Sequence, residues 1–168
     1  MMRGIDQLLF LAQIAVAIAG FAGIVVGLLS RSSHKWVAFE RARFSDFLAI
    51  TLGCALFSIV PLILASVPLS TQQIVAFCGI PAALYFAFFT ARAARQYRHL
   101  GEGTPRYRLV QARAVFCVTL LLALLVTLNS IGIVFDRALW VYTMFLVWIL
   151  VWAGLRFMRI IQSAIQSS

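Results

Sequence analysis

The sequence predicts an all-α fold, an integral membrane bundle of five transmembrane helices. Hydrophobic residues make up 63% of the 168 positions and charged residues only 11%, whereas soluble domains are about 45–50% apolar and about 25% charged. The few charges also gather in short segments between long charge-free runs. A soluble chain of this length has too little interior to hide so much apolar surface. We therefore expect lipid as the solvent and one transmembrane domain over residues 1–168.

The charge-free runs have the length of membrane crossings, since about 20 apolar residues span the roughly 30 Å hydrocarbon core. One run is too long: 45 uncharged residues separate Asp46 from Arg92, and a single helix of that length would extend roughly 68 Å. This run must fold back, and the polar segment 68–73 supplies the break. The predicted helices cover residues 7–30, 46–67, 74–100, 105–134 and 138–157.

The basic residues predict the orientation of the bundle. With five spans, one side holds only Arg3 and Arg137, and the other side holds the remaining twelve Lys and Arg residues. Cytoplasmic loops of membrane proteins collect Lys and Arg, so we expect the N-terminus outside and the C-terminus in the cytosol. Dropping any one span would scatter these charges over both sides, so the asymmetry also supports the number five.

Two helix ends extend beyond the predicted membrane. Gly101 is suited to end the third helix, and Thr104 with Pro105 to begin the fourth, which predicts a cytosolic hairpin. In residues 157–166, apolar side chains recur at helical spacing, with polar side chains on the opposite face. That pattern predicts a C-terminal amphipathic extension lying along the inner interface.

The first predicted helix carries a ridge of small residues four positions apart: Ala15, Ala19, Gly23 and Gly27. Small residues let helix backbones approach closely in lipid, where no hydrophobic drive brings helices together. We interpret the ridge as a helix-packing face, at the centre of the bundle or of a homo-oligomer. The alternative is that the ridge lines a pore.

The stretch 14–25, with the pattern AxxIAGFAGIV from Ala15 to Val25, resembles the first helix of small uncharacterised bacterial polytopic membrane proteins. The basic loop that follows is similar too, as is the second helix with Leu52-Gly53 and Pro61-Leu62. The likeness is good over about the first third of the chain and loose beyond it. It implies the bacterial cytoplasmic (inner) membrane and brings no activity with it.

A few polar side chains fall within the predicted spans. Gln13 and Asn129 lie at similar depth in the first and fourth helices, and we expect this intramembrane polar pair to hydrogen-bond across helices; a polar ring around a small outer vestibule is the alternative. Asp46 lies at the cytosolic entrance of the second helix, where the helix dipole favours a carboxylate. No helix carries an acid, Lys or His near its middle, which argues against proton-coupled transport.

The cytosolic hairpin is strongly basic. Its arginines are Arg92, Arg95, Arg98, Arg106, Arg108 and Arg113. Basic groups at the inner surface attract anionic headgroups, so we expect membrane lipids as partners; a docking site for a protein is the alternative. Because these charges lie in loops rather than over a soluble face, nucleic-acid binding is not expected.

The sequence contains no catalytic arrangement. No Ser, His and Asp side chains share one membrane depth, and the three cysteines lack metal-ligand spacing. We therefore expect no enzymatic activity, no metal and no cofactor. The leading hypothesis is a non-enzymatic polytopic protein that acts through helix packing, as an oligomer or as a subunit of a larger membrane complex. The alternative is a small oligomeric channel or facilitator.

Overall fold

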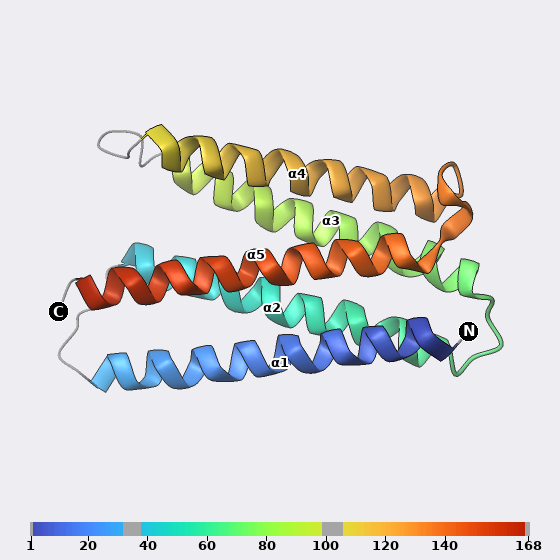
Figure 1. The fold of residues 1–168 in the computed structure, drawn as a ribbon, viewed down its shortest axis with the longest axis horizontal. Helices are drawn as coiled ribbons and strands as arrows, with labels where there is room; N and C mark the ends of the chain where they lie inside the picture. Colours follow the sequence, from blue (N-terminus) through green and yellow to red (C-terminus); the bar gives the residue numbers. More distant parts are fainter. Residues whose placement is uncertain (1, 32–37, 99–105, 167–168) are drawn as a thin grey trace. The chain divides into compact units, whose positions relative to one another are not determined.

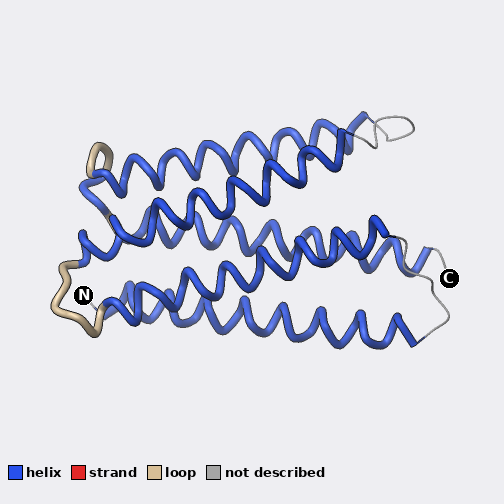
Figure 2. Tube along the Cα trace, turned by 180° about the vertical axis from the view of Figure 1, so that it is seen from behind, coloured by secondary structure: helices blue, strands red, loops and turns tan. Residues whose placement is uncertain are grey.

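The computed structural model describes residues 2–31, 38–98 and 106–166, and all regular structure in these ranges is helical (Figure 2). The elements are α1 (Met2–Arg31), α2 (Ala38–Leu64), α3 (Thr71–Arg98), α4 (Arg106–Ile131), the short η1 (Phe135–Arg137) and α5 (Leu139–Gln166). Five helices contain segments long and apolar enough to cross a membrane, namely Asp6–Gly27, Phe44–Leu64, Thr71–Ala93, Arg113–Ile131 and Leu139–Arg159. The prediction of five membrane-spanning helices is confirmed at this level.

Several helix boundaries differ from those expected. The second helix begins at Ala38 rather than at residue 46, and the fifth continues to Gln166 without a break before its amphipathic part. The expected boundaries were placed at the charged residues, which mark where the membrane ends. A helix can continue past that point, because its backbone groups pair with each other in water as well as in lipid. The expected hairpin tip at Gly101, Thr104 and Pro105 lies outside the described residues.

The chain divides into two compact units, which are described separately. Unit 1 comprises Met1–Leu62 with Leu146–Ser168, and unit 2 comprises Ile63–Phe145. In unit 1, α1 and the greater part of α5 run in the same direction, and α2 runs opposite to them (Figure 1). In unit 2, α3 and α4 form an antiparallel hairpin, followed by η1 and the first turns of α5.

An aromatic cluster joins the three helices of unit 1. The ring of Phe157 in α5 stacks on Phe47 of α2, with centroids 5.2 Å apart, and meets Phe21 of α1 edge-on at 6.1 Å. Aromatic pairs in these geometries contribute about 0.5–1.5 kcal/mol beyond their buried area. Phe157 is only 6% exposed. The side chain with which the predicted interfacial tail begins is therefore part of the core of unit 1.

The packed face of α1 includes half of the predicted small-residue ridge. The buried residues of α1 are Leu8, Leu11, Ala12, Ala15, Ala19 and Ala22. Gly23 and Gly27 are exposed, and a Cβ added to either would meet no atom within 4 Å. A ladder of four-residue steps turns by about 40° per step, because a helix has 3.6 residues per turn. By Gly27 the ridge has left the buried face, so a Cβ added in its glycine half would have open space beside it.

The close helix approach in unit 2 occurs at Gly79. A Cβ at this position would collide with Oγ of Ser130 and would lie 3.3 Å from Cγ1 of Val126. The Ser130 hydroxyl lies 2.8 Å from the Val126 carbonyl of its own helix and 3.3 Å from the Val75 carbonyl of α3. Gly79 and the buried Ala83 are four residues apart, the spacing typical of helix association in lipid. α3 thus has a close small-residue contact of the kind predicted for the first helix.

A reciprocal cap fixes the start of α3. The backbone N–H of Gln73 donates to Oγ of Ser70 over 3.3 Å, and the backbone N–H of Ser70 donates to Oε1 of Gln73 over 2.9 Å. This arrangement is a capping box, which satisfies donors that the first helical turn leaves open. The polar segment predicted to break the long apolar run therefore also sets where the next helix begins.

The contact at Gly79 predicts a sharp response to one methyl group. Gly79→Ala should force α3 away from α4 and destabilise unit 2 by about 1–3 kcal/mol, the usual cost of overpacking. Heating in detergent followed by gel filtration would measure this as an earlier loss of the folded peak. Gly154→Ala is the matched control, since a Cβ there meets nothing within 4 Å, and it should be neutral or slightly stabilising.

A double variant tests whether the Ser130 hydroxyl is the obstacle. Gly79→Ala combined with Ser130→Ala should be less unstable than the sum of the two single changes, because the clashing oxygen is gone. Strict additivity, or a Gly79→Ala protein as stable as the parent, would show that the two helices do not meet at this point.

Candidate functional site

Seven hydroxyl side chains of the described helices are satisfied within their own helices. Each donates to the carbonyl four residues earlier in its own helix, over 2.6–3.0 Å. The residues are Thr51, Ser58, Thr90, Thr119, Thr127, Ser130 and Thr143. This back-bonding uses the one donor that a hydroxyl has. These side chains therefore serve their own helices rather than offering free donors to a solute.

Asn129 makes two hydrogen bonds through its side chain within the described spans. It is completely buried, its Nδ2 donates to the carbonyl of Ala138 over 3.0 Å, and its Oδ1 accepts from the backbone N–H of Ala138 over 2.9 Å. In lipid, backbone groups that no helix pairs must find partners within the protein. Asn129 thus pairs with both backbone groups of Ala138, and the pairing of Asn129 with Gln13 stays a prediction.

The α4–α5 corner, residues 129–138, has demanding backbone chemistry. Gly132 takes a φ of 88°, its N–H donates to the carbonyl of Asn129 over 3.1 Å, and the Ile133 N–H donates to the carbonyl of Leu128 over 3.0 Å. This pair of bonds is a Schellman motif, in which glycine ends a helix without a Cβ penalty. Phe135 and Arg137 also have positive φ, 56° and 58°. Non-glycine residues in this region cost about 1–3 kcal/mol each unless surrounding contacts hold them.

Arg137 closes this corner from the outside of the turn. Its Nη2 donates to the carbonyl of Ile131 over 3.5 Å, and its Nε would lie 3.3 Å from a Cβ added to Gly132. A cation beside the last carbonyls of a helix is favoured by the helix dipole. The corner thus consists of a glycine turn, an arginine on the end of α4 and the Asn129 clamp on Ala138. The bonds of these groups hold the backbone of the corner in place.

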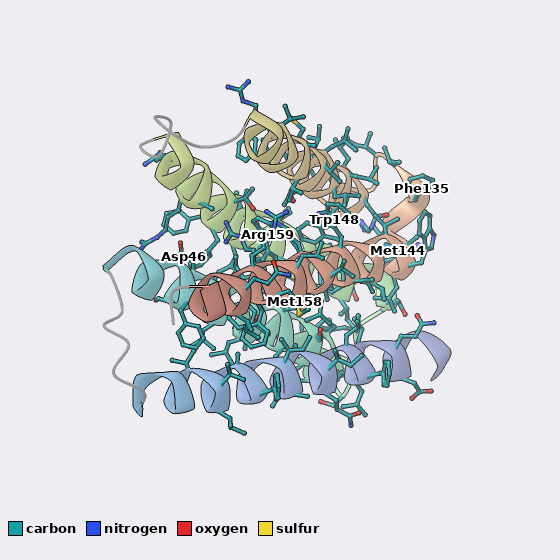
Figure 3. The ribbon with its side chains drawn as sticks, turned by 60° about the vertical axis from the view of Figure 1, so that its left-hand side comes forward. Asp46, Phe135, Met144, Trp148, Met158 and Arg159 are labelled. Atoms are coloured by element: carbon teal, nitrogen blue, oxygen red, sulfur yellow. The ribbon has the colours of Figure 1, made fainter. Side chains whose placement is uncertain are left out.

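Asp46 lies in the early turns of α2 and is only 2% exposed. Figure 3 shows it at the same end of unit 1 as Arg159, in the last turns of α5. Burial of a carboxylate is costly without compensation. The sequence placed Asp46 at a membrane entrance, and the described span that contains it begins nearby, at Phe44.

The hairpin arginines gather at one end of unit 2. α3 ends at Arg98 and α4 begins at Arg106, so their basic turns adjoin (Figure 1). The side chains of Arg92, Arg95 and Arg113 are exposed, and those of Arg98, Arg106 and Arg108 lie outside the described set. Whether this basic end meets lipid headgroups or a protein stays a prediction.

On the face of α1 that points away from its packed side chains, Gln13, Gly20, Gly23 and Gly27 are exposed. The glycines have open space beside them. Gln13 lies well inside the span Asp6–Gly27. An uncovered amide next to bare backbone is unusual surface for a helix in hydrocarbon.

Comparisons with known proteins add no assignment to this geometry. No protein-family model, curated protein or solved structure matches the chain. Among the described residues, no group of three or more His, Cys, Asp or Glu is placed to hold a metal ion. Interpretation therefore depends on the chain's own contacts.

Two features were missed from the sequence, although each has a signal there. Gly79 and Ala83 repeat the four-residue spacing of small residues that we noted only in the first helix. Gly132 comes directly after the apolar run that ends at Ile131, which is where a helix-ending glycine is usually found. The bond from Asn129 to Ala138 had no signal, because a side chain that pairs with a peptide nine residues away depends on the turn between them.

The Asn129 clamp predicts a large difference between two neighbouring substitutions. Asn129→Leu should remove both Asn129 bonds to Ala138, at about 0.5–1.5 kcal/mol for each bond lost, while the Ala138 N–H keeps its bond to the Phe135 carbonyl. Thr127→Val removes a hydroxyl bonded only to a carbonyl of its own helix and should cost less than about 1 kcal/mol. Unfolding midpoints in mixed micelles of increasing denaturing detergent would compare them. Equal stability of the two variants would exclude a clamping role for Asn129.

Proposed function

We propose that this chain is a small, non-enzymatic multi-pass protein of the bacterial inner membrane. It acts through helix packing, either as a homo-oligomer or as a subunit of a larger membrane complex. The five apolar helices support the membrane part of the proposal. The inner membrane follows from the resemblance of the stretch 14–25, and the N-outside orientation from the distribution of Lys and Arg.

The coverage of α1 carries the proposal. Only 22% of the α1 span is buried within the chain, against 28% for the span of α4 and 44% for the spans of α2, α3 and α5. Part of the uncovered surface is glycine, at Gly20, Gly23 and Gly27. Close backbone contact is a main source of helix association in lipid, so a glycine surface gains more from a partner helix than from acyl chains. α1 thus offers a surface suited to a further helix.

The packing hypothesis is favoured over an oligomeric channel or facilitator. A water-filled path needs polar groups along one continuous helix face. The buried hydroxyls of the described helices instead donate to their own backbones, and Asn129 is fully engaged by Ala138. We propose anionic lipid headgroups as further partners of the exposed arginines at the basic end of unit 2.

The assembly hypothesis predicts a particle larger than one chain. In nanodiscs formed directly from membranes, the protein should have a mass above 18.6 kDa, as a multiple of the chain or together with a second protein in fixed ratio. Mass photometry with protein identification would measure this, and empty nanodiscs provide the baseline. A single chain without a companion at every lipid-to-protein ratio would contradict the proposal.

The orientation predicts which introduced thiols react from outside the cell. Val67→Cys lies in the exposed connection between α2 and α3, and Arg95→Cys lies at the basic end of α3. A membrane-impermeant thiol reagent should label the first in intact cells and the second only after permeabilisation. The parent chain, with its own three cysteines, gives the background. Labelling of Arg95→Cys in intact cells would contradict the predicted orientation.

A further inference from the structure

We propose that a second copy of this chain covers α1, with the two α1 helices parallel about a two-fold axis. The Gln13 side chains of the two copies hydrogen-bond to each other, and Gly20 and Gly27 lie where the helices cross. This inference depends on the assembly proposed above and names its partner and its contact face.

Gln13 is the observation that demands a partner. It lies seven residues after Asp6, where its span begins, about 10 Å along the helix at 1.5 Å per residue and therefore within a hydrocarbon core of roughly 30 Å. Its side chain is exposed, and the described residues provide no hydrogen-bond partner for it. Acyl chains accept and donate no hydrogen bonds. An amide at this position gains from another polar group at the same depth.

The exposed face of α1 is continuous and opposite to its core. Gln13, Gly20 and Gly27 are seven residues apart, a spacing that keeps side chains within about 20° of one line per step. Ala15, Ala19 and Ala22, which are buried, lie on the other side of the helix by the same count. The amide and the two glycines thus share one stripe of exposed positions.

A second copy fits this stripe without further assumptions. Copies inserted in the same membrane share one orientation, so their α1 helices are parallel and both Gln13 residues lie at the same depth. An amide carries donors and an acceptor, so the group complements itself across a two-fold axis. Gly20 and Gly27 have no side chain to keep the two backbones apart, and a Cβ added at either meets nothing within the chain. An unrelated helix would need a polar group at the matching depth.

The first test changes the amide while keeping an apolar helix. Gln13→Leu suits lipid, so insertion should be intact, but dimer dissociation in liposomes should rise about 3- to 30-fold. Dilution with excess lipid, followed by single-molecule photobleaching of a labelled chain, would measure the dimer fraction. Gln13→Asn keeps the amide and should retain most of the association. A dimer fraction unaffected by Gln13→Leu would overturn the inference.

The second test reports contact directly and does not depend on the stability of the Leu variant. Gln13→Cys should form a disulfide-linked dimer in membranes under mild oxidant, because the two-fold axis places the same position of both copies together. Leu121→Cys, 64% exposed on α4, is the matched control and should not cross-link. Absence of the Gln13→Cys dimer would equally overturn the inference.

The outcomes separate this inference from the proposed function. An assembly that persists in Gln13→Leu and does not cross-link at position 13 would overturn the α1 dimer and leave the assembly hypothesis standing. A particle with the mass of one chain at every dilution would overturn both the α1 dimer and the assembly hypothesis. A larger particle containing a second protein, with that protein cross-linked at position 13, would assign the stripe to a different partner and would also overturn the α1 dimer.

Discussion

A hydrocarbon environment offers no hydrogen bonds, and most of the polar geometry of this protein follows from that constraint. A helix pairs its own backbone groups, but turns and polar side chains within the spans need partners from elsewhere in the protein. Seven Ser and Thr hydroxyls of the described helices donate to carbonyls of their own helices, over 2.6–3.0 Å. The backbone at the α4–α5 corner is satisfied by the Schellman bonds at Gly132 and by the Asn129 side chain. Most of these bonds are local, although Ser130 and Cys54 also reach carbonyls of neighbouring helices, and shape decides much of how the helices meet.

Shape operates differently in the two units. In unit 2, a missing side chain at Gly79 brings α3 against Ser130 and Val126 of α4. In unit 1, bulk performs the same task, since Phe157 fills the space between Phe21 of α1 and Phe47 of α2. Both solutions replace the hydrophobic drive that is absent between helices in lipid. Phe157 lies near the C-terminal end of α5, so its contacts with Phe21 and Phe47 fix that end of the helix against unit 1.

The sequence was sufficient for the number and type of elements, because the length and apolarity of a span are constraints on composition alone. It was less informative about boundaries: charges near Arg41 and Arg43 mark a membrane limit, yet α2 begins before them, at Ala38. The role of the small-residue ridge in helix packing stays a prediction, and the structure divides the ridge between two faces of α1. Ala15 and Ala19 are buried, but a four-residue ladder rotates around the helix and takes Gly27 to the open side. The contact between Gly79 and Ser130 depends on the register of two helices, which periodicity within one helix does not encode.

The two amides that the sequence paired lead to opposite conclusions. Asn129 lies beside a turn whose peptide needs a donor and an acceptor, and the bonds to Ala138 satisfy both groups. Gln13 lies in the middle turns of a helix whose backbone is already paired, so no peptide nearby requires it, and its side chain points away from the buried face of α1. The same constraint that explains why Asn129 is buried therefore makes Gln13 incomplete within one chain. The exposed face of α1 thus carries an amide at Gln13 and two glycines further along the helix, at Gly20 and Gly27. A parallel copy of the same helix would provide a hydrogen-bond partner for the amide and a close backbone contact for the glycines.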